Sequence, residues 1–339
     1  MTHREANNYR VGVIGSGSWG TALSVIANRA GSQVVLGTRN RNVIQSISEH
    51  RINDIYLPQI YLDPKISVTE KLAECCLGDM IIIAVPSQVV RWVCITISDV
   101  IPPKIPILIA SKGIERGSLM LMSEVSQAIL PDNPVGILSG PNFADEAAKG
   151  LPTATTLASR DPQLLTMASF AIGGRFFRPY TTDDIIGTQI GGAVKNVIAI
   201  ACGIAIGKQL GENACAALVT RGFLEMARLA TAMGARHETL MGLSGLGDLL
   251  LTCGSRKSRN MSFGIAIGEG RQKEDVLGER GRTATEGVVA AESIHKISRK
   301  QGVVMPICDA VYRVLHESAD VNRVIQELLE RPFTNEGLS

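Results

Sequence analysis

The segment VGVIGSGSWG, residues 11–20, places Gly15, Gly17 and Gly20 in the spacing G-x-G-x-x-G. An apolar run precedes these glycines, and a helix-forming run over residues 21–28 follows them. In such a strand–turn–helix the first glycine permits a tight turn, the second lets the backbone approach a pyrophosphate, and the third allows close packing of helix on strand. The N–H groups at the start of the helix point toward the phosphates. An ordinary glycine-rich turn has the same bare pattern, but its position between strand and helix favours a dinucleotide site.

Short β-branched runs alternate with amphipathic stretches from residue 11 to about residue 180. The expected strands are residues 11–14, 33–38, 80–85, 106–110, 135–138 and 153–158. This alternation is typical of a parallel sheet with helices on both faces. Four of these strands are followed by small or polar residues. The glycine turn follows the first strand, Ser87 follows residues 80–85, Ser111 and Lys112 follow residues 106–110, and Ser139 and Gly140 follow residues 135–138. Ligands of open α/β sheets bind at the carboxyl ends of strands, so we expect one shared site there.

Strand signals stop near residue 185, and long helical patterns follow, for example over residues 212–233 and 285–300. We therefore expect an α/β domain of the doubly wound Rossmann type over residues 1–187 and an all-α domain over residues 188–339. A chain of 339 residues is long enough to bury two cores without disulfides.

Composition argues against several classes of protein. The chain carries 34 basic and 32 acidic residues, and its net charge of +2 offers no broad electrostatic footprint for nucleic acid. The seven cysteines show no CxxC spacing and the five histidines show no ligand spacing, so we expect reduced thiols, no metal and a cytoplasmic protein. The N-terminal residues 1–10 are polar and lack the apolar core of a secretory signal, which predicts a short frayed tail.

Lys195 is the only charged residue in an apolar run of 23 residues, 185–207. Burial lowers the pKa of a lysine, which suits it to exchange a proton near neutral pH. A buried salt bridge is the alternative role and would not exclude catalysis. The run is also long enough to span a bilayer. Gln189, Lys195 and Asn196 near its middle, many glycines and the lack of a second span favour a buried central helix without membrane insertion.

Two further groups of residues lie in the helical half. Asp248 stands among small and apolar residues at an expected loop-to-helix transition, where the simpler interpretation is a helix N-cap. Ser258, Arg259 and Asn260 lead into an expected helix, and a hydroxyl, a guanidinium and an amide at a helix start can hold a phosphate. A basic surface loop explains the same three residues equally well.

Several segments, in order along nearly the whole chain, resemble the NAD(P)-dependent glycerol-3-phosphate dehydrogenases of the bacterial type. They are GSGSWGTAL (15–23), SKGIE (111–115), SGPNFADE (139–146), GGAVKNVIAIACGI (191–204), GLSGLGDLLLTC (242–253), KSRN (257–260) and TEG (285–287). The chain departs from the family pattern at Asn142, where Ser or Thr is usual, and at Ile206 and Lys208. Asn142 still offers hydrogen bonds. The departures at Ile206 and Lys208 put the local loop and regulation by product in doubt, but not the role of Lys195.

The resemblance implies reversible hydride transfer between a nicotinamide and C2 of dihydroxyacetone phosphate, giving sn-glycerol 3-phosphate for phospholipid synthesis, in a homodimer. It implies that Lys195 exchanges a proton with the substrate oxygen, that Lys112 holds the substrate, and that Asp248 orients or balances the two lysines. Further substrate contacts are implied for Gly140, Asn142, Ser258, Arg259 and Asn260. Cofactor contacts are implied for Gly15, Gly17, Ser18, Trp19, Gly20, Arg39, Lys112, Ala144, Arg259 and Glu286.

The residues after the second expected strand indicate the choice of cofactor. NAD enzymes often carry an acidic residue about twenty positions past the glycines, which binds the ribose 2′-hydroxyl. Here the chain reads Gly37, Thr38, Arg39, Asn40, with Arg41 next, and an arginine favours a 2′-phosphate. We therefore expect that the protein accepts NADPH as well as NADH and prefers NADPH.

Two other classes of protein compete with this interpretation. Dehydrogenases of the β-hydroxyacid type also join a Rossmann half to a helical half with a lysine on the connecting helix, but the SRN and GLGDLLLT segments argue against them. A dinucleotide-binding redox sensor without turnover has no need for Lys112, Lys195 and Asp248 together.

Overall fold

The computed structural model describes residues 8–279, 286–333 and 335, which form two compact units. The first unit holds the described residues up to Ser111 together with Met122–Ile185, and the second holds Lys112–Leu121 and the described residues from Ile186 onward. Residues 1–7, in the expected N-terminal tail, and Thr285, the expected first residue of a helix, lie outside the described residues.

This division differs from the expected one at residues 187 and 188 because the chain enters the second unit twice. Ile114 and Leu121 are buried in the apolar core of the second unit, which is why the ten residues Lys112–Leu121 group with it. Lys112 therefore belongs to the second unit, although it follows a strand of the first.

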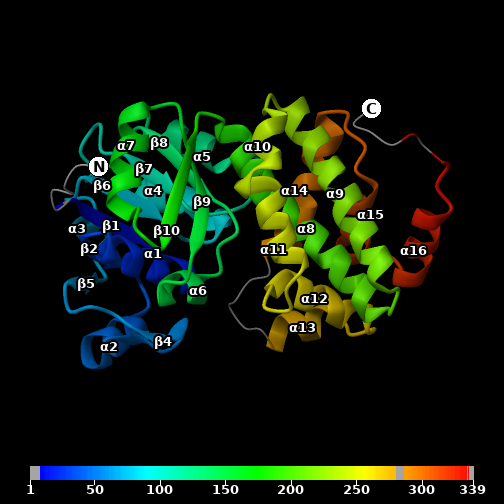
Figure 1. Ribbon diagram of the computed structural model, residues 1–339, viewed down its shortest axis with the longest axis horizontal. Coiled ribbons are helices and arrows are strands. Elements are labelled where there is room, and N and C mark those ends of the chain that lie inside the picture. Colours follow the sequence, from blue (N-terminus) through cyan, green and yellow to red (C-terminus); the bar gives the residue numbers. More distant parts are fainter. Residues whose placement is uncertain (1–7, 280–285, 334, 336–339) are drawn as a thin grey trace. The chain divides into compact units, whose positions relative to one another are not determined.

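One eight-stranded sheet forms the centre of the first unit (Figure 1). Its strands in spatial order are β10 (Phe177–Thr182), β9 (Thr153–Ser159), β8 (Val135–Ser139), β7 (Ile107–Ile109), β6 (Met80–Ile83), β1 (Arg10–Ile14), β2 (Gln33–Gly37) and β5 (Ile66–Thr69). The chain runs from β1 outward to β2 and β5, then returns to β6 and proceeds the other way to β7 and β8. The order thus reverses between β1 and β6, and ligands of doubly wound sheets bind at such a switch point.

The edge of the sheet corrects one expectation. The six strands from β8 to β5 are parallel, but β9, which covers the expected strand at residues 153–158, runs antiparallel to β8, so a wholly parallel sheet is wrong. The connection from β8 to β9 contains only a six-residue helix, α6 (Ala144–Lys149), which packs against α1. A parallel return needs a crossover helix that runs back along the strand, about 17 Å for five residues, whereas the six residues of α6 rise only about 9 Å.

The helices of the first unit form two groups that pack among themselves. Because right-handed crossovers that proceed in opposite directions along a sheet lie on opposite faces, α1 and α4 cover different faces. The first group is α1 (Ser18–Arg29), α6 and α7 (Pro162–Ile172), and the second is α3 (Leu72–Cys75), α4 (Val90–Ile97) and α5 (Met122–Ile129). Along the chain, β2 and β5 are connected by α2 (Arg41–His50) and a hairpin of β3 (Ile52–Asn53) and β4 (Leu57–Tyr61).

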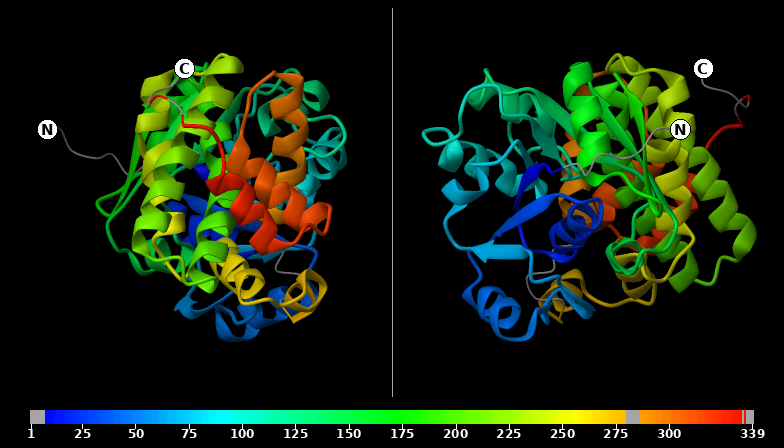
Figure 2. Two further views of the ribbon diagram at one scale, coloured as in Figure 1. Left: turned by 90° about the vertical axis from the view of Figure 1, so that its right-hand side faces the viewer. Right: turned by 60° about the vertical axis from the view of Figure 1, so that its left-hand side comes forward.

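The second unit is a bundle of helices (Figures 1 and 2). Beside α8 (Ile185–Gly207) they are α9 (Glu212–Ala232), α10 (His237–Met241), a π-helical turn (Leu243–Gly247), α11 (Asp248–Cys253), α12 (Arg259–Gly268), α13 (Lys273–Glu279), α14 (Glu286–Lys300), α15 (Pro306–His316) and α16 (Val321–Leu329). The fold class expected from the sequence, a Rossmann-type α/β domain followed by a helical domain, is confirmed.

Helix α8 is the centre of this bundle, and every residue from Gly187 to Ala205 is buried. Its glycines allow close approach, since a Cβ on Gly203 would lie 2.2 Å from the carbonyl oxygen of Met261 in α12. Among the described residues α8 is the one helix long and apolar enough to cross a membrane, but 89% of its apolar window is buried inside the protein. Such burial favours the core helix over the membrane span.

Candidate active site

The glycine turn after β1 has the geometry that a pyrophosphate requires. Gly15 has a φ of +116°, and a Cβ on Gly20 would lie 1.8 Å from the carbonyl oxygen of Gly15. These two glycines are therefore demanded by the protein's own packing. Gly17 is different, because a Cβ there would meet nothing within 4 Å. Gly17 is also the N-cap of α1 and supplies no side-chain acceptor for the first N–H groups, so the open space beside it fits an anionic group.

The side chains of Ser18 and Trp19 have other partners within the first unit. The Ser18 hydroxyl donates a hydrogen bond of 2.8 Å to the carbonyl oxygen of Tyr56, and the Trp19 ring lies 6.5 Å from the ring of Phe177. Both residues stand in the first turn of α1, where backbone N–H groups have no helical acceptor. The backbone N–H groups of both residues are therefore available to a pyrophosphate.

Arg39, which follows β2, is exposed, and its guanidinium carbon lies 4.1 Å from the ring centroid of Trp92. Arg41, the second arginine of this loop, is instead 3.5 Å from a carboxylate oxygen of Glu70. Within the described residues Arg39 has no ion pair, so its N–H groups are available to a ligand.

The loop after β8 carries three of the residues predicted for binding. Gly140 has a φ of +152°, and a Cβ there would lie 3.1 Å from Cα of Thr155. The Asn142 amide donates to the carbonyl oxygen of Ala154 and accepts from the hydroxyl of Thr155, each at 3.0 Å. Ala144 is the first residue of α6. The side chain of Asn142 thus ties the loop to β9.

Three charged side chains of the second unit meet at Asp248. One carboxylate oxygen lies 2.6 Å from Nζ of Lys195, and the other lies 2.8 Å from Nζ of Lys112. Asp248 is 1% exposed and Lys195 is 8% exposed. A single buried carboxylate therefore balances two ammonium groups, which leaves an excess positive charge where a phosphate or a developing oxyanion would be stabilised.

The backbone around Asp248 explains how this contact arises. Helix α11 begins at Asp248, and Gly247 occupies the N-cap position, so the carboxylate is not used as a cap. The preceding π-helical turn lies against α8, because a Cβ on Gly191 would be only 2.4 Å from the carbonyl oxygen of Ser244. Turns of this kind occur frequently at functional sites.

Thr252 is a member of the cluster that sequence reasoning missed. Its hydroxyl accepts a hydrogen bond of 2.9 Å from Nζ of Lys195 and donates to the backbone carbonyl of Asp248 at 2.6 Å. The available signal was the spacing of four residues from Asp248, which places both on one face of a helix. Lys195 thus has two fixed acceptors.

Burial lowers the pKa of Lys195 to about 8. The negative charge of Asp248 opposes this change, and the positive charge of Lys112 adds to it. Because the loss of hydration outweighs the ion pair, the neutral amine and the ammonium are both populated slightly above neutral pH. Such a group can donate and accept a proton under ordinary conditions.

Glu286 and Arg259 belong to the same electrostatic environment. Burial raises the pKa of the Glu286 carboxyl, and the charges of Arg259, Lys195 and Lys112 counteract that rise. Together with Asp248, the group contains three cations and two carboxyl groups. The excess of positive charge suits an anionic ligand.

Ser258 and Asn260 have structural partners. The Ser258 hydroxyl caps α12 by accepting a hydrogen bond of 3.3 Å from the N–H of Met261. The Asn260 amide donates to Oδ1 of Asn196 at 2.8 Å and accepts from the N–H of Gly287 at 3.0 Å. Asn260 of α12 therefore links Asn196 of α8, which is next to Lys195, with Gly287 of α14, which is next to Glu286.

The segment that carries Lys112 is fixed to α14. The Ser293 hydroxyl donates to the carbonyl oxygen of Ile114 at 3.4 Å, and Arg116 lies 2.9 Å from a carboxylate oxygen of Glu292. These contacts hold the segment in the second unit and thereby bring Lys112 to Asp248.

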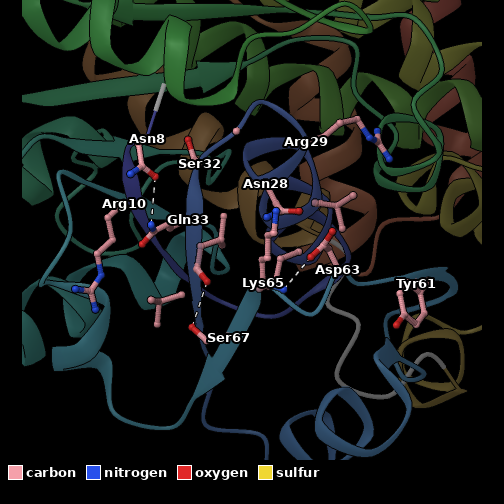
Figure 3. Close-up of a pocket in the computed structure, with 15 residues that line it drawn as sticks. Asn8, Arg10, Asn28, Arg29, Ser32, Gln33, Tyr61, Asp63, Lys65 and Ser67 are labelled. Atoms are coloured by element: carbon pink, nitrogen blue, oxygen red, sulfur yellow. Dashed lines mark hydrogen bonds between the residues drawn. The ribbon is translucent and has the colours of Figure 1, made fainter. Parts of the chain in front are cut away.

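A surface cavity of about 890 Å³ lies elsewhere in the first unit (Figure 3). Its walls include the first residues of three strands, Arg10 of β1, Gln33 of β2 and Ile66 of β5. It therefore opens at the amino ends of these strands, whereas the glycine turn and Arg39 lie at their carboxyl ends. It contains none of the predicted site residues.

Comparisons with known proteins agree on one family. A model described as the NAD-dependent glycerol-3-phosphate dehydrogenase N-terminus matches residues 10–165, and the model of the C-terminus matches residues 184–326. A protein of Parvibaculum lavamentivorans named glycerol-3-phosphate dehydrogenase, NAD(P)+, is 46% identical over 96% of this chain and 98% of its own length. A protein of Rhodospirillum rubrum with the same name is 47% identical over 96% of this chain and 94% of its own length.

A solved structure is also similar over its whole length. The glycerol-3-phosphate dehydrogenase of Coxiella burnetii superposes with a TM-score of 0.92 at 39% identity, covering 96% of this chain and 100% of that chain. The similarity therefore extends over both units.

Proposed function

The chain belongs to the NAD-dependent glycerol-3-phosphate dehydrogenase family, and we propose that it catalyses the reversible reduction of dihydroxyacetone phosphate to sn-glycerol 3-phosphate. The observation that carries this proposal is the buried Asp248 that holds Lys195 and Lys112. A dehydrogenase needs one group that exchanges a proton with the substrate oxygen and another that binds the substrate's charge. The cluster supplies both.

Lys195 is the proton donor in the direction of reduction. NADPH or NADH, when bound, would supply the hydride to C2. The carbonyl oxygen then carries an additional electron pair, which needs a proton. Nζ of Lys195 gives its proton to that oxygen, and in the oxidative direction the neutral amine takes the hydroxyl proton back. Its pKa of about 8, lowered by burial, lets both forms exist near neutral pH.

Asp248 and Thr252 position this proton donor. Their oxygens lie 2.6 and 2.9 Å from Nζ of Lys195, so the ammonium cannot turn freely. Lys112 occupies the second carboxylate oxygen and adds the positive charge that holds the substrate. Arg259 adds to the positive field, which suits the phosphate of the substrate.

The first unit binds the cofactor through the turn at residues 15–20. Three features support this assignment: the open space beside Gly17, the uncapped first turn of α1 and the position at the switch point of the sheet. Arg39, exposed and without an ion pair in the described part of the chain, supports a preference for NADPH over NADH. The backbone of Ser18 and Trp19 completes the turn.

The remaining assignments rest on the family resemblance. They are Gly140, Asn142, Ser258 and Asn260 as substrate contacts, and Ala144, Glu286, Arg259 and Lys112 as cofactor contacts. Ser258 and Asn260 retain spare hydrogen-bonding capacity beside the partners described above, since a hydroxyl has one donor and two acceptor sites and an amide has two of each.

The cellular setting is inferred in the same way. The product would feed phospholipid synthesis, and a cytoplasmic homodimer is the expected form. The seven cysteines are all free, which is usual where thiols stay reduced. Light scattering during gel filtration would test the dimer, and a mass of one chain would contradict it.

The proposed activity is tested by mixing the protein with dihydroxyacetone phosphate and NADPH and following the loss of NADPH absorbance. We expect turnover whose product is sn-glycerol 3-phosphate. Tight binding of NADPH without oxidation would instead favour a redox sensor. Turnover only with a hydroxyacid or its oxo form would favour the β-hydroxyacid class of dehydrogenase.

A further inference from the structure

The contact between Arg39 and Trp92 is the feature of the first unit that the mechanism above leaves unexplained. The guanidinium carbon lies 4.1 Å from the centroid of the Trp92 ring, which is within the range of a cation–π contact. The two residues are 53 positions apart, and Trp92 is 41% exposed. The contact therefore joins a large exposed aromatic ring to an exposed arginine.

We infer that Trp92 is a positioning residue for cofactor choice: its indole holds the Arg39 guanidinium ready for the 2′-phosphate of NADPH. The inference rests on the proposed dinucleotide-dependent function and adds to it a residue outside the family segments quoted above.

The topology places this contact at the cofactor end of the sheet. Arg39 follows the carboxyl end of β2, and Trp92 stands in the first turn of α4, which begins soon after the carboxyl end of β6. β2 and β6 are the two neighbours of β1, whose carboxyl end carries the glycine turn. The two side chains therefore meet from strands on either side of the strand that leads into the pyrophosphate site.

The backbone beside Arg39 is already fixed. The N–H of Thr38 donates to the carbonyl oxygen of Thr69 at 2.9 Å, and the Thr38 hydroxyl accepts from the N–H of Asn40 at 3.2 Å. What remains free to move is the long side chain of Arg39 itself. An indole surface that covers the guanidinium removes much of that freedom before the ligand arrives.

A stacked arginine keeps its hydrogen-bond donors. A salt bridge would occupy the N–H groups of the guanidinium, whereas a contact over the ring face leaves its in-plane donors pointing outward. Arg41 shows the alternative, because it lies 3.5 Å from Glu70. Arg41 thereby balances a carboxylate that would repel a phosphate, and Arg39 stays available for bidentate binding.

The test is a set of binding titrations of the full-length protein, by calorimetry and without substrate, with NADPH and with NADH. Wild type is expected to bind NADPH more tightly. Trp92→Ala should raise the Kd for NADPH about threefold to fivefold, the factor expected from an exposed cation–π contact, and change the Kd for NADH less than about twofold. Trp92→Phe, which keeps an aromatic face, should recover part of the loss. Ile95→Ala, which truncates a 56% exposed neighbour on α4, is the matched control and should change neither Kd.

A double-mutant cycle separates positioning from direct contact. If Trp92 acts through Arg39, the double variant Arg39→Ala with Trp92→Ala should bind NADPH no more weakly than Arg39→Ala alone. Equal losses of affinity for NADPH and NADH in Trp92→Ala, or additive losses of affinity in the double variant, would overturn the inference. Normal turnover of the wild type would in that case leave the proposed function standing. A wild-type protein that bound neither dinucleotide would overturn the proposed function and this inference with it.

Discussion

The glycine turn of the first unit and the lysine–aspartate cluster of the second are both suited to charged ligands, but the first is formed by backbone groups and the second by side chains. The turn uses backbone alone, and its key position, Gly17, has empty space where a side chain would be. The cluster uses buried side chains, with Asp248 joining Lys112 and Lys195 from 136 and 53 positions away. The turn therefore depends on the close approach of its own backbone and of Ala84 beside it, whereas the cluster depends on the packing of the whole helical unit.

This difference separates binding from chemistry. Changes in the turn should alter the affinity for the cofactor and leave the cluster intact. Changes at Lys195 or Asp248 should alter the rate and leave the affinity for the cofactor intact. A variant that violates either expectation would contradict this division of roles between the two regions.

Lys195→Ala should have the largest effect. Loss of the proton donor is expected to lower kcat by about 10²- to 10⁴-fold, the usual contribution of general acid–base catalysis. The Kd for NADPH should stay within about twofold of wild type, because the turn is untouched. Steady-state kinetics and calorimetry measure the two quantities. Lys208→Ala, a lysine just beyond the end of α8, is the matched control and should retain full activity.

Asp248→Asn should come next, with effects on both rate and stability. The substitution leaves two ammonium groups without their carboxylate, so we expect the free energy of unfolding to fall by about 3 kcal/mol, as for a broken buried ion pair. A misplaced lysine should also lower kcat by about 10²-fold. Urea denaturation measures the first effect. Asp309→Asn, which removes the partner of His295 in a more exposed pair, should cost about 1 kcal/mol or less. Equal costs at both sites would contradict the special role of Asp248.

Two glycines of the turn should give smaller effects of different kinds, one on cofactor affinity and the other on stability. Gly17→Ala should leave the free energy of unfolding within about 0.5 kcal/mol of wild type, because its Cβ meets nothing, but it should raise the Kd for NADPH about tenfold by intruding on the pyrophosphate. Gly20→Ala should destabilise the fold by about 1 to 3 kcal/mol, because its Cβ would overlap the carbonyl oxygen of Gly15. Normal NADPH binding by Gly17→Ala would contradict the placement of the pyrophosphate.

The difference between the two regions also explains how much could be predicted from the sequence. The glycine turn and the strands β1, β2, β6, β7 and β8 were predictable because buried parallel strands are short apolar runs between glycines and helices. β10 was missed because FRPYTT has no apolar run, and β5 because its four residues ISVT give too little pattern. The direction of β9 depends on the shortness of the helix α6 in its connection, which composition does not encode.

The candidate site was predictable only in part. Lys195 was predictable as the single charge in an apolar helix. Its distance to Asp248, however, depends on a π-helical turn that no local sequence pattern predicts. The place of Lys112 in the second unit results from a ten-residue excursion held by Ile114 and Leu121. Trp92 gave no signal, because its partner Arg39 lies on another strand connection.

The most direct test of Lys195 as the proton donor is the pH dependence of kcat/KM measured in both directions of the reaction. Reduction needs the ammonium, so its rate should fall as pH rises through about 8, the value to which burial lowers the pKa of Lys195. Oxidation needs the neutral amine, so its rate should rise through the same pH. Mirror-image limbs with one shared pKa, absent from the residual activity of Lys195→Ala, are the expected result. Limbs that run in the same direction, or that persist in Lys195→Ala, would show that another group moves the proton.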